Sequence, residues 1–284
     1  MIEKLFTSFG DIFYNDTDHT YNNGTLISVT QFLTKKNKQF NEDYESKYKA
    51  LQYSGRNVKR IYNGKSVNTD FITVDGNKIK MDLFDWDSLK FTPDYVKKSW
   101  EETRLLGTEF GSFIHSYAEN LGRRWVHCPE LITPIVTKLS PNNQLEYIRR
   151  VQVGMQLVKR FYKDHPHLHT IVSEFTIGSE ELKIAGTFDR LFFNTLTNEY
   201  ELWDFKTDKQ ITFENQYDKF EGTDIECSSF NKYSLQLSMY RYIIRYVTGI
   251  DIKTAKVCWF NHTENEYRII ETKDYTDLIK QWLQ

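Results

Sequence analysis

Residues 185–209 constrain the fold more strongly than any other part of the chain. They read AGTFDRLFFNTLTNEYELWDFKTDK and contain two β-type runs of apolar and aromatic residues. Because side chains alternate between the two faces of a strand, Asp204 and Lys206 project from one face. Tyr200 and Leu202 share that face, and Trp203 and Phe205 project from the opposite one. A strand that is otherwise apolar on both faces belongs in a covered sheet, so the segment predicts neighbouring strands with helices on both sides.

Charged residues lie near the ends of these two runs. Asp189 precedes the apolar run 191–193, and Asp204 and Lys206 end the second run. Buried charges are costly unless they pair or bind a metal. Two carboxylates offer hard oxygen ligands for Mg²⁺ or Mn²⁺, and an ammonium beside them can stabilise charge on a phosphoryl group. A simple salt bridge between Asp204 and Lys206 is the alternative interpretation.

The rest of the chain predicts an α/β fold with a central mixed β-sheet flanked by helices. Residues 1–97 are interpreted as an N-terminal elaboration with a hairpin, a helix capped near Ser28 and a mobile basic loop within 35–65. Residues 98–284 are expected to form the core. Helices are predicted at 93–122, 142–162, 230–247 and the C-terminus, and strands near 170–177, 182–193, 199–206, 257–260 and 267–270.

Composition narrows the function classes. The formal net charge is −2, so no basic surface for tight nonspecific duplex binding is expected. Aromatic residues make up 15% of the chain, which suits a large core and also the stacking of unpaired bases. Abundant lysine and asparagine hint at an AT-rich genome such as a bacteriophage's. With no apolar run of transmembrane length and an acidic start, the expected location is the cytoplasm, or the host cytoplasm for a phage protein.

The cysteine and histidine patterns do not favour a metal site. Cys128, Cys227 and Cys258 show no pair spacing and are too few for a four-cysteine iron–sulfur cluster. His165, His167 and His169 alternate, but Pro166 and the missing fourth ligand favour a loop entering a strand over a zinc site.

Four motifs, in order along residues 98–271, resemble the PD-(D/E)xK nucleases of the RecB-like exonuclease branch, in the manner of phage members. The first is a helical Gly-x-x-x-His-x-x-x-Glu, and the last is a helical Gln-x-x-x-Tyr. Between them lie Gly-x-x-Asp and Asp-x-Lys-Thr on successive strands. The residues that match are Gly111, His115 and Glu119, then Gly186 and Asp189, then Asp204, Lys206 and Thr207, and finally Gln236 and Tyr240.

This resemblance implies a restriction-endonuclease-like core and a Mg²⁺- or Mn²⁺-dependent deoxyribonuclease, with an exonuclease on single strands or DNA ends favoured. His115, Asp189 and Asp204 would hold metal, and Glu174 falls where the family often has a further ligand. The implied catalytic residues are Asp189, Asp204, Lys206, Gln236 and Tyr240. The expected partner is DNA, with a helicase or single-strand-binding protein as a further candidate and no membrane. The alternative is a noncatalytic or partner-dependent nucleic-acid-binding protein with a nuclease-like core.

Overall fold

The computed structural model describes residues 12, 14–15, 20–37, 40–64, 66–122, 139–215 and 218–284. The chain divides into two compact units, a large unit of residues 1–38 and 107–284 and a small unit of residues 39–106. The sequence segment 1–97 is therefore distributed over both units. Asp18 and His19 of the predicted hairpin and Cys128 lie outside the described residues.

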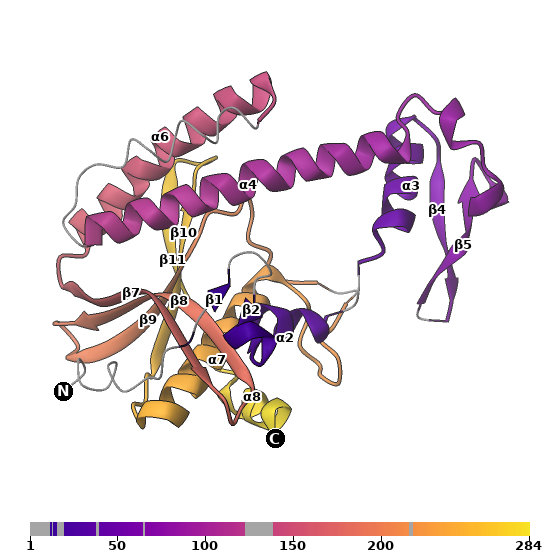
Figure 1. Cartoon of the computed structure of the whole chain (residues 1–284). Helices are drawn as coiled ribbons and strands as arrows, with labels where there is room; N and C mark the ends of the chain where they lie inside the picture. Colours follow the sequence, from indigo (N-terminus) through magenta and orange to yellow (C-terminus); the bar gives the residue numbers. More distant parts are fainter. Residues whose placement is uncertain are drawn as a thin grey trace. The chain divides into compact units, whose positions relative to one another are not determined.

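The large unit is built on a six-stranded mixed sheet (Figure 1). Its strands run in the order β11-β10-β9-β8-β3, and β7 also pairs with β8. The β10–β9 and β3–β8 pairs are parallel, whereas β10–β11, β8–β9 and β7–β8 are antiparallel. The strands are β3 (Ile27–Ser28), β7 (Leu168–Ser179), β8 (Ile184–Asn194), β9 (Glu199–Lys206), β10 (Thr254–Asn261) and β11 (Glu266–Glu271).

Helices cover both faces of this sheet. Leu202 of β9 belongs to the buried core that includes Ile243 of one helix, whereas Trp203 and Phe205 pack 5.5 and 5.6 Å from the Phe161 ring of another. The predicted α/β class, a mixed sheet flanked by helices, is confirmed. The helices are α2 (Val29–Lys35), α6 (Pro141–Asp164), α7 (Ser229–Thr248), α8 (Thr276–Leu283) and α4 (Pro93–Gly122), which contributes residues to both units.

Local sequence signals set several helix ends. Ser28 caps α2 and forms a capping box with Gln31, which satisfies backbone donors that the first helical turn leaves free. Ser228 caps α7 in the same way, with its side chain accepting from the backbone of Asn231. Gly249 ends α7 with a left-handed φ of 72°, a conformation that glycine adopts without steric cost. A short pair, β1 (Tyr14–Asn15) and β2 (Thr20–Tyr21), precedes the 3₁₀ turn Asn22–Gly24.

The small unit has its own sheet and core. It contains α3 (Glu42–Tyr53), the antiparallel strands β4 (Val58–Asn63), β5 (Ser66–Val74) and β6 (Asn77–Lys80), two 3₁₀ turns at Met81–Leu83 and Trp86–Ser88, and the start of α4. Its buried core consists of Tyr44, Leu51, Ile72, Val74 and Met81. Residues 58–63, part of the stretch 35–65 in which the sequence shows no strong period, form β4, which pairs with β5 outward from Asn63 and Ser66.

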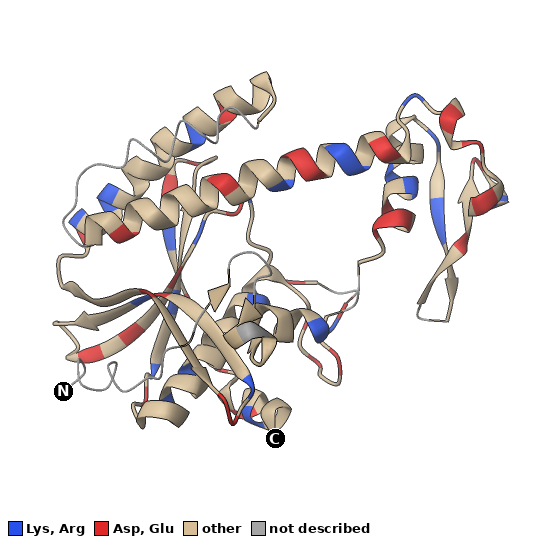
Figure 2. Ribbon diagram, viewed as in Figure 1, with Lys and Arg blue, Asp and Glu red and all other residues tan. Residues whose placement is uncertain are grey.

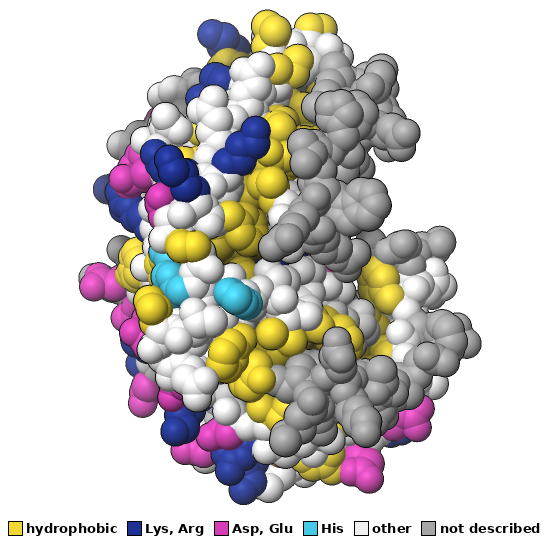
Figure 3. All heavy atoms as spheres, turned by 90° about the vertical axis from the view of Figure 1, so that its left-hand side faces the viewer, with side chains coloured by type: hydrophobic (Ala, Val, Ile, Leu, Met, Phe, Trp, Pro, Cys, Tyr) yellow, Lys and Arg dark blue, Asp and Glu magenta, His cyan; other side chains and the backbone are white. Residues whose placement is uncertain are grey.

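Charge is spread evenly over the described parts of the molecule. Lysine and arginine alternate with aspartate and glutamate along α4 and on the small unit (Figure 2). The face drawn in Figure 3 likewise mixes cationic and acidic side chains, with hydrophobic side chains between them. Of the helices that the structure describes, none has the length and apolarity needed to cross a bilayer.

Candidate metal centre

Three potential metal ligands from three different elements converge in the large unit. They are His115 of α4, Glu174 of β7 and Asp189 of β8, and one ligand atom from each lies within 4.8 Å of the others. His115 Nδ1 is 3.5 Å from Glu174 Oε1 and 3.5 Å from Asp189 Oδ2. Among the described residues, this is the one histidine, cysteine and carboxylate group with such geometry.

The position of Glu174 depends on an unusual backbone. Its φ is 45°, in the left-handed region that a side chain rarely adopts within a strand. Ser173 pairs with Arg190 and Phe175 with Phe188, so Glu174 lies opposite Asp189. Backbone strain of this kind concentrates at functional sites. Here it accompanies the placement of a carboxylate beside His115.

Asp189 also joins β8 to β9. Its Oδ2 accepts a 2.6 Å hydrogen bond from the backbone N–H of Phe205, so its carboxylate lies against the peptide that follows Asp204. Arg190 pairs with Trp203, which makes Asp189 and Asp204 the next residues facing each other along the two strands. The two carboxyl side chains are therefore neighbours.

Asp204 and Lys206 form an ion pair on β9. Lys206 Nζ lies 2.6 Å from Asp204 Oδ2, and their side chains are 18% and 3% exposed. Both side chains thus project from one face of the strand, as the alternation predicts. The Asp204 carboxylate is not part of the three-residue group formed by His115, Glu174 and Asp189.

Burial and charge shift the proton affinities of these groups. Burial alone would lower the pKa of His115, but the Asp189 and Glu174 carboxylates outweigh it and raise the pKa to about 10. Burial raises the pKa of Asp204, although the nearby Lys206 ammonium acts in the opposite direction. At Asp189 burial would also raise the pKa, but the charge and the hydrogen bond of His115 outweigh it, so the pKa is lowered. Asp204 and Asp189 also outweigh burial at Lys206 and raise the pKa of that ammonium. Close opposite charges therefore dominate the site.

Gln236 and Tyr240 lie behind β8 on α7. The Tyr240 hydroxyl donates a 2.8 Å hydrogen bond to the Thr187 carbonyl, and Gln236 hydrogen-bonds the Tyr240 side chain. Gly186 permits this approach, because a Cβ there would lie 2.8 Å from Tyr240 Cε1. The pair contacts the backbone two residues before Asp189 and does not join the cluster of ligand atoms.

Sequence reasoning missed two residues beside the site. Arg190 is fully buried, donates from Nη1 to the Asp189 carbonyl at 2.6 Å and lies 3.8 Å from Glu174 Oε1. Tyr233 of α7 lies under Lys206, whose Nζ is 4.9 Å from the ring centre. In the sequence, Arg190 could have been found because it directly follows Asp189. Tyr233 could have been found because it lies almost one helical turn before Gln236 on the same helix.

The donor set fits a divalent cation. Two carboxylates and one imidazole suit Mn²⁺ or Mg²⁺. Glu174 Oε1 is buried and makes no close hydrogen bond, since its cationic neighbours His115 Nδ1 and Arg190 Nη1 lie 3.5 and 3.8 Å away. Such an oxygen is costly to bury unless a cation or water satisfies it. The other histidine-rich segment differs, because His165 Nδ1 lies 2.9 Å from the Phe161 carbonyl and its ring stacks on Phe161.

Comparison with protein-family models gives no match to this chain, and comparison with curated proteins finds none that is significantly similar. The resemblance to PD-(D/E)xK nucleases is therefore carried by the motif residues themselves.

Proposed function

We propose that the chain is a metal-dependent nuclease of PD-(D/E)xK type that hydrolyses phosphodiester bonds in DNA, acting as an exonuclease on single strands or DNA ends. The observation that carries the proposal is the convergence of His115, Glu174 and Asp189 next to the Asp204–Lys206 pair. An ion pair between Asp204 and Lys206 alone would not require an imidazole and two further carboxylates beside it.

The proposed roles follow from the positions of the side chains. His115, Glu174 and Asp189 would hold Mg²⁺ or Mn²⁺, with Asp204 as a further oxygen ligand from β9. Such an ion would act as a Lewis acid towards a phosphoryl oxygen and would lower the pKa of a water bound to it. The Lys206 ammonium can orient the attacking water and offset charge that develops on the phosphoryl oxygens.

Gln236 and Tyr240 take a positioning role in this proposal. Through the Thr187 carbonyl they fix the segment of β8 that carries Asp189. Arg190 acts in a similar way, because its guanidinium contacts the Asp189 carbonyl and lies close to Glu174. Direct contact of Gln236 or Tyr240 with the scissile strand is not required.

Purified protein incubated with end-labelled single- and double-stranded DNA tests the proposal directly. Cleavage is expected with Mg²⁺ or Mn²⁺, and none with EDTA or in Asp189→Asn. Release of mononucleotides from labelled ends would indicate an exonuclease, whereas internal products would indicate an endonuclease. If neither DNA nor RNA is cleaved with either metal, a noncatalytic or partner-dependent nucleic-acid-binding protein becomes the better proposal.

A further inference from the structure

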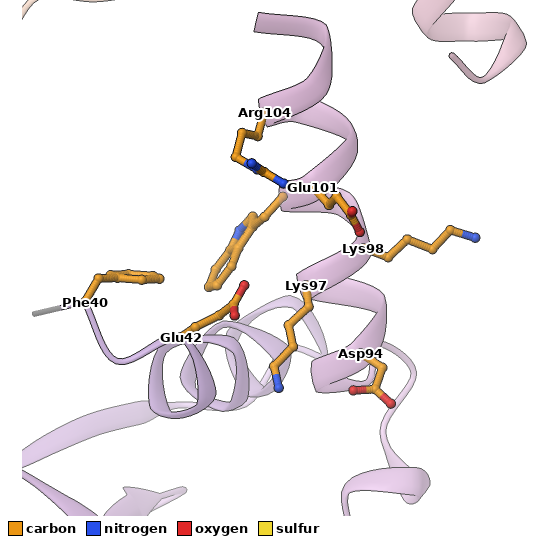
Figure 4. Close-up of a pocket in the computed structure, with 8 residues that line it drawn as sticks. Phe40, Glu42, Asp94, Lys97, Lys98, Glu101 and Arg104 are labelled. Atoms are coloured by element: carbon orange, nitrogen blue, oxygen red, sulfur yellow. The ribbon is translucent and has the colours of Figure 1, made fainter. Parts of the chain in front are cut away.

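A hollow in the small unit, outside the candidate metal centre, is lined by aromatic and charged side chains (Figure 4). Its volume is about 930 Å³. The lining residues come from the segment that leads into α3, from the first residue of α3 and from one stretch of α4, and those that the argument uses are Phe40, Glu42, Lys97, Trp100 and Arg104.

Phe40 is exposed because it lacks the usual apolar partner in α3. It directly precedes Asn41, the N-cap of α3, and an apolar residue at this position often packs on the fourth residue of the helix. That residue is Glu45, which pairs with Arg60 instead. Phe40 packs beside Trp100, with ring centres 5.8 Å apart and planes inclined by 59°, and remains 68% exposed.

Charged side chains border the two rings. Lys97, Trp100 and Arg104 are spaced by three and four residues on α4 and so share a helix face. Figure 4 shows Glu42 and Lys97 near the start of α3, and Arg104 further along α4. Lys97 Nζ lies 3.6 Å from Asp43 Oδ1. Side chains of both charge signs therefore line the hollow together with the two rings.

We propose that this hollow binds an unpaired nucleotide of a single-stranded nucleic acid. A nucleotide combines a flat aromatic base, an anionic phosphate and neutral hydrogen-bond donors on the base edge and sugar. The rings match the base, Lys97 and Arg104 match the phosphate, and Glu42 matches the donors. Because the ring centres are closer than two stacking steps of roughly 3.4 Å each, the base covers the exposed face of Phe40 and does not enter between the rings.

The site selects single strands, since the faces of paired bases are already stacked within a duplex. The inference rests on the proposed function for its expectation of a nucleic acid. It concerns binding, which can be measured in EDTA where no cleavage occurs.

Fluorescence anisotropy with labelled dT and rU 12-mers and a blunt DNA duplex, all in EDTA, tests the site in the full-length protein. Phe40→Ala should weaken binding of the 12-mers by roughly 5- to 150-fold, the range for loss of one base–aromatic stack. Phe40→Trp should restore it. The matched control is Tyr62→Ala, which removes another exposed aromatic from the small unit and should leave binding unchanged.

Charge is tested by the salt dependence of the same binding. Arg104→Ala should reduce the slope of log K against log salt by about 0.7, the value for one phosphate contact on a single strand. Lys59→Ala, which removes an exposed cation from β4, is the control and should not change the slope.

The outcomes separate this inference from the proposed function. Three outcomes would overturn the inference, even if DNA is cleaved. They are equal binding by wild type and Phe40→Ala, tighter binding of the duplex than of the 12-mers, and no binding by the wild type. Binding that depends on Phe40 in a protein without nuclease activity would support the nucleotide site while the proposed function fails.

Discussion

At the scale of single residues, Lys206 separates a catalytic site from a structural ion pair. Lys206→Ala should still bind Mn²⁺, because the ammonium is not a metal ligand, yet lose about 10²–10³ in cleavage rate. Lys206→Arg should rescue poorly, since a planar guanidinium cannot replace a compact ammonium. Single-turnover cleavage and calorimetric Mn²⁺ titration measure the two effects. Lys253→Ala, at an exposed lysine of the large unit, is the control, and equal cleavage by wild type and Lys206→Ala would remove Lys206 from the active site.

The charge on His115 makes metal binding depend on pH. With a pKa raised to about 10, the imidazole carries a proton at neutral pH and must lose it to bind a cation. At pH values below this pKa, each increase in pH raises the fraction of His115 that is neutral. The apparent Mn²⁺ affinity should therefore rise by up to about tenfold per pH unit. Calorimetry in buffers of different ionisation enthalpy should detect release of about one proton per ion. An affinity that stays constant between pH 6 and 9 would contradict this arrangement.

His262 makes the stability of the fold depend on pH, because its pKa is lowered in the folded protein. It is buried, its ring lies 5.0 Å from that of Phe110, and burial with the nearby Arg150 lowers its pKa to about 4 from the ordinary 6.5. The unfolded chain therefore binds this proton more tightly. Stability should be lost as the pH falls from 6.5 to 4, by roughly 3 kcal/mol in total.

Urea unfolding of wild type and His262→Phe at several pH values measures this loss. The substitution should reduce the fall in stability between pH 6.5 and 4, whereas replacement of the exposed His169 by alanine serves as the control. Parallel pH profiles for wild type and His262→Phe would assign the acid sensitivity to other groups.

At the scale of secondary-structure elements, the contact between β8 and α7 depends on Gly186. A Cβ at this position would lie 2.8 Å from Tyr240 Cε1, 2.9 Å from its hydroxyl oxygen and 3.0 Å from Val29 Cγ2. Gly186→Ala should therefore destabilise the protein by about 1–3 kcal/mol and weaken Mn²⁺ binding by displacing the strand that carries Asp189. Gly107→Ala on α4 is the matched control, because its Cβ meets nothing within 4 Å and should stabilise the helix by up to about 1 kcal/mol. Equal stabilities for the two variants would mean that α7 can move away from β8 at little cost.

Elements with strong local patterns could be predicted from the sequence. The alternation in residues 199–206 matches β9, and the periodic apolar residues of 142–162 match α6 closely. Strand β4 was not recognised, because its residues are mostly polar and none is fully buried, so no alternation of apolar residues marks it, although its pairing with β5 is local. The left-handed Glu174 was equally hidden, since nothing in Ser-Glu-Phe-Thr indicates a positive φ. The sequence offered the Asp204–Lys206 ion pair as an alternative interpretation, and the structure contains that pair. Asp189, expected near a strand end, lies in the middle of β8. Only the folded sheet shows that Arg190 lies beside Glu174.

At the scale of the whole molecule, the chain carries separate buried cores in its two units. The core of the large unit includes Leu202 and Ile243, and that of the small unit is centred on Leu51 and Ile72. Sites that share no core partners usually respond independently to substitution. The metal centre and the nucleotide-binding hollow also lie in different units, so damage to one core should affect one site.

Leu51→Ala tests this independence. Leu51 is fully buried, so its truncation should cost the small unit about 2–5 kcal/mol. Because this unit has only 68 residues between 39 and 106, and domains of that size are marginally stable, it should unfold first on heating as a separate calorimetric transition. Binding of the 12-mers should fall with it, while Mn²⁺ affinity at the centre of His115, Glu174 and Asp189 should stay within about twofold of wild type.

Leu202→Ala in the large unit is the reciprocal variant and should lower Mn²⁺ affinity instead. A single cooperative transition that shifts equally in both variants, together with joint loss of both binding activities, would show that the two units fold as one, with the long helix α4 transmitting the damage between them.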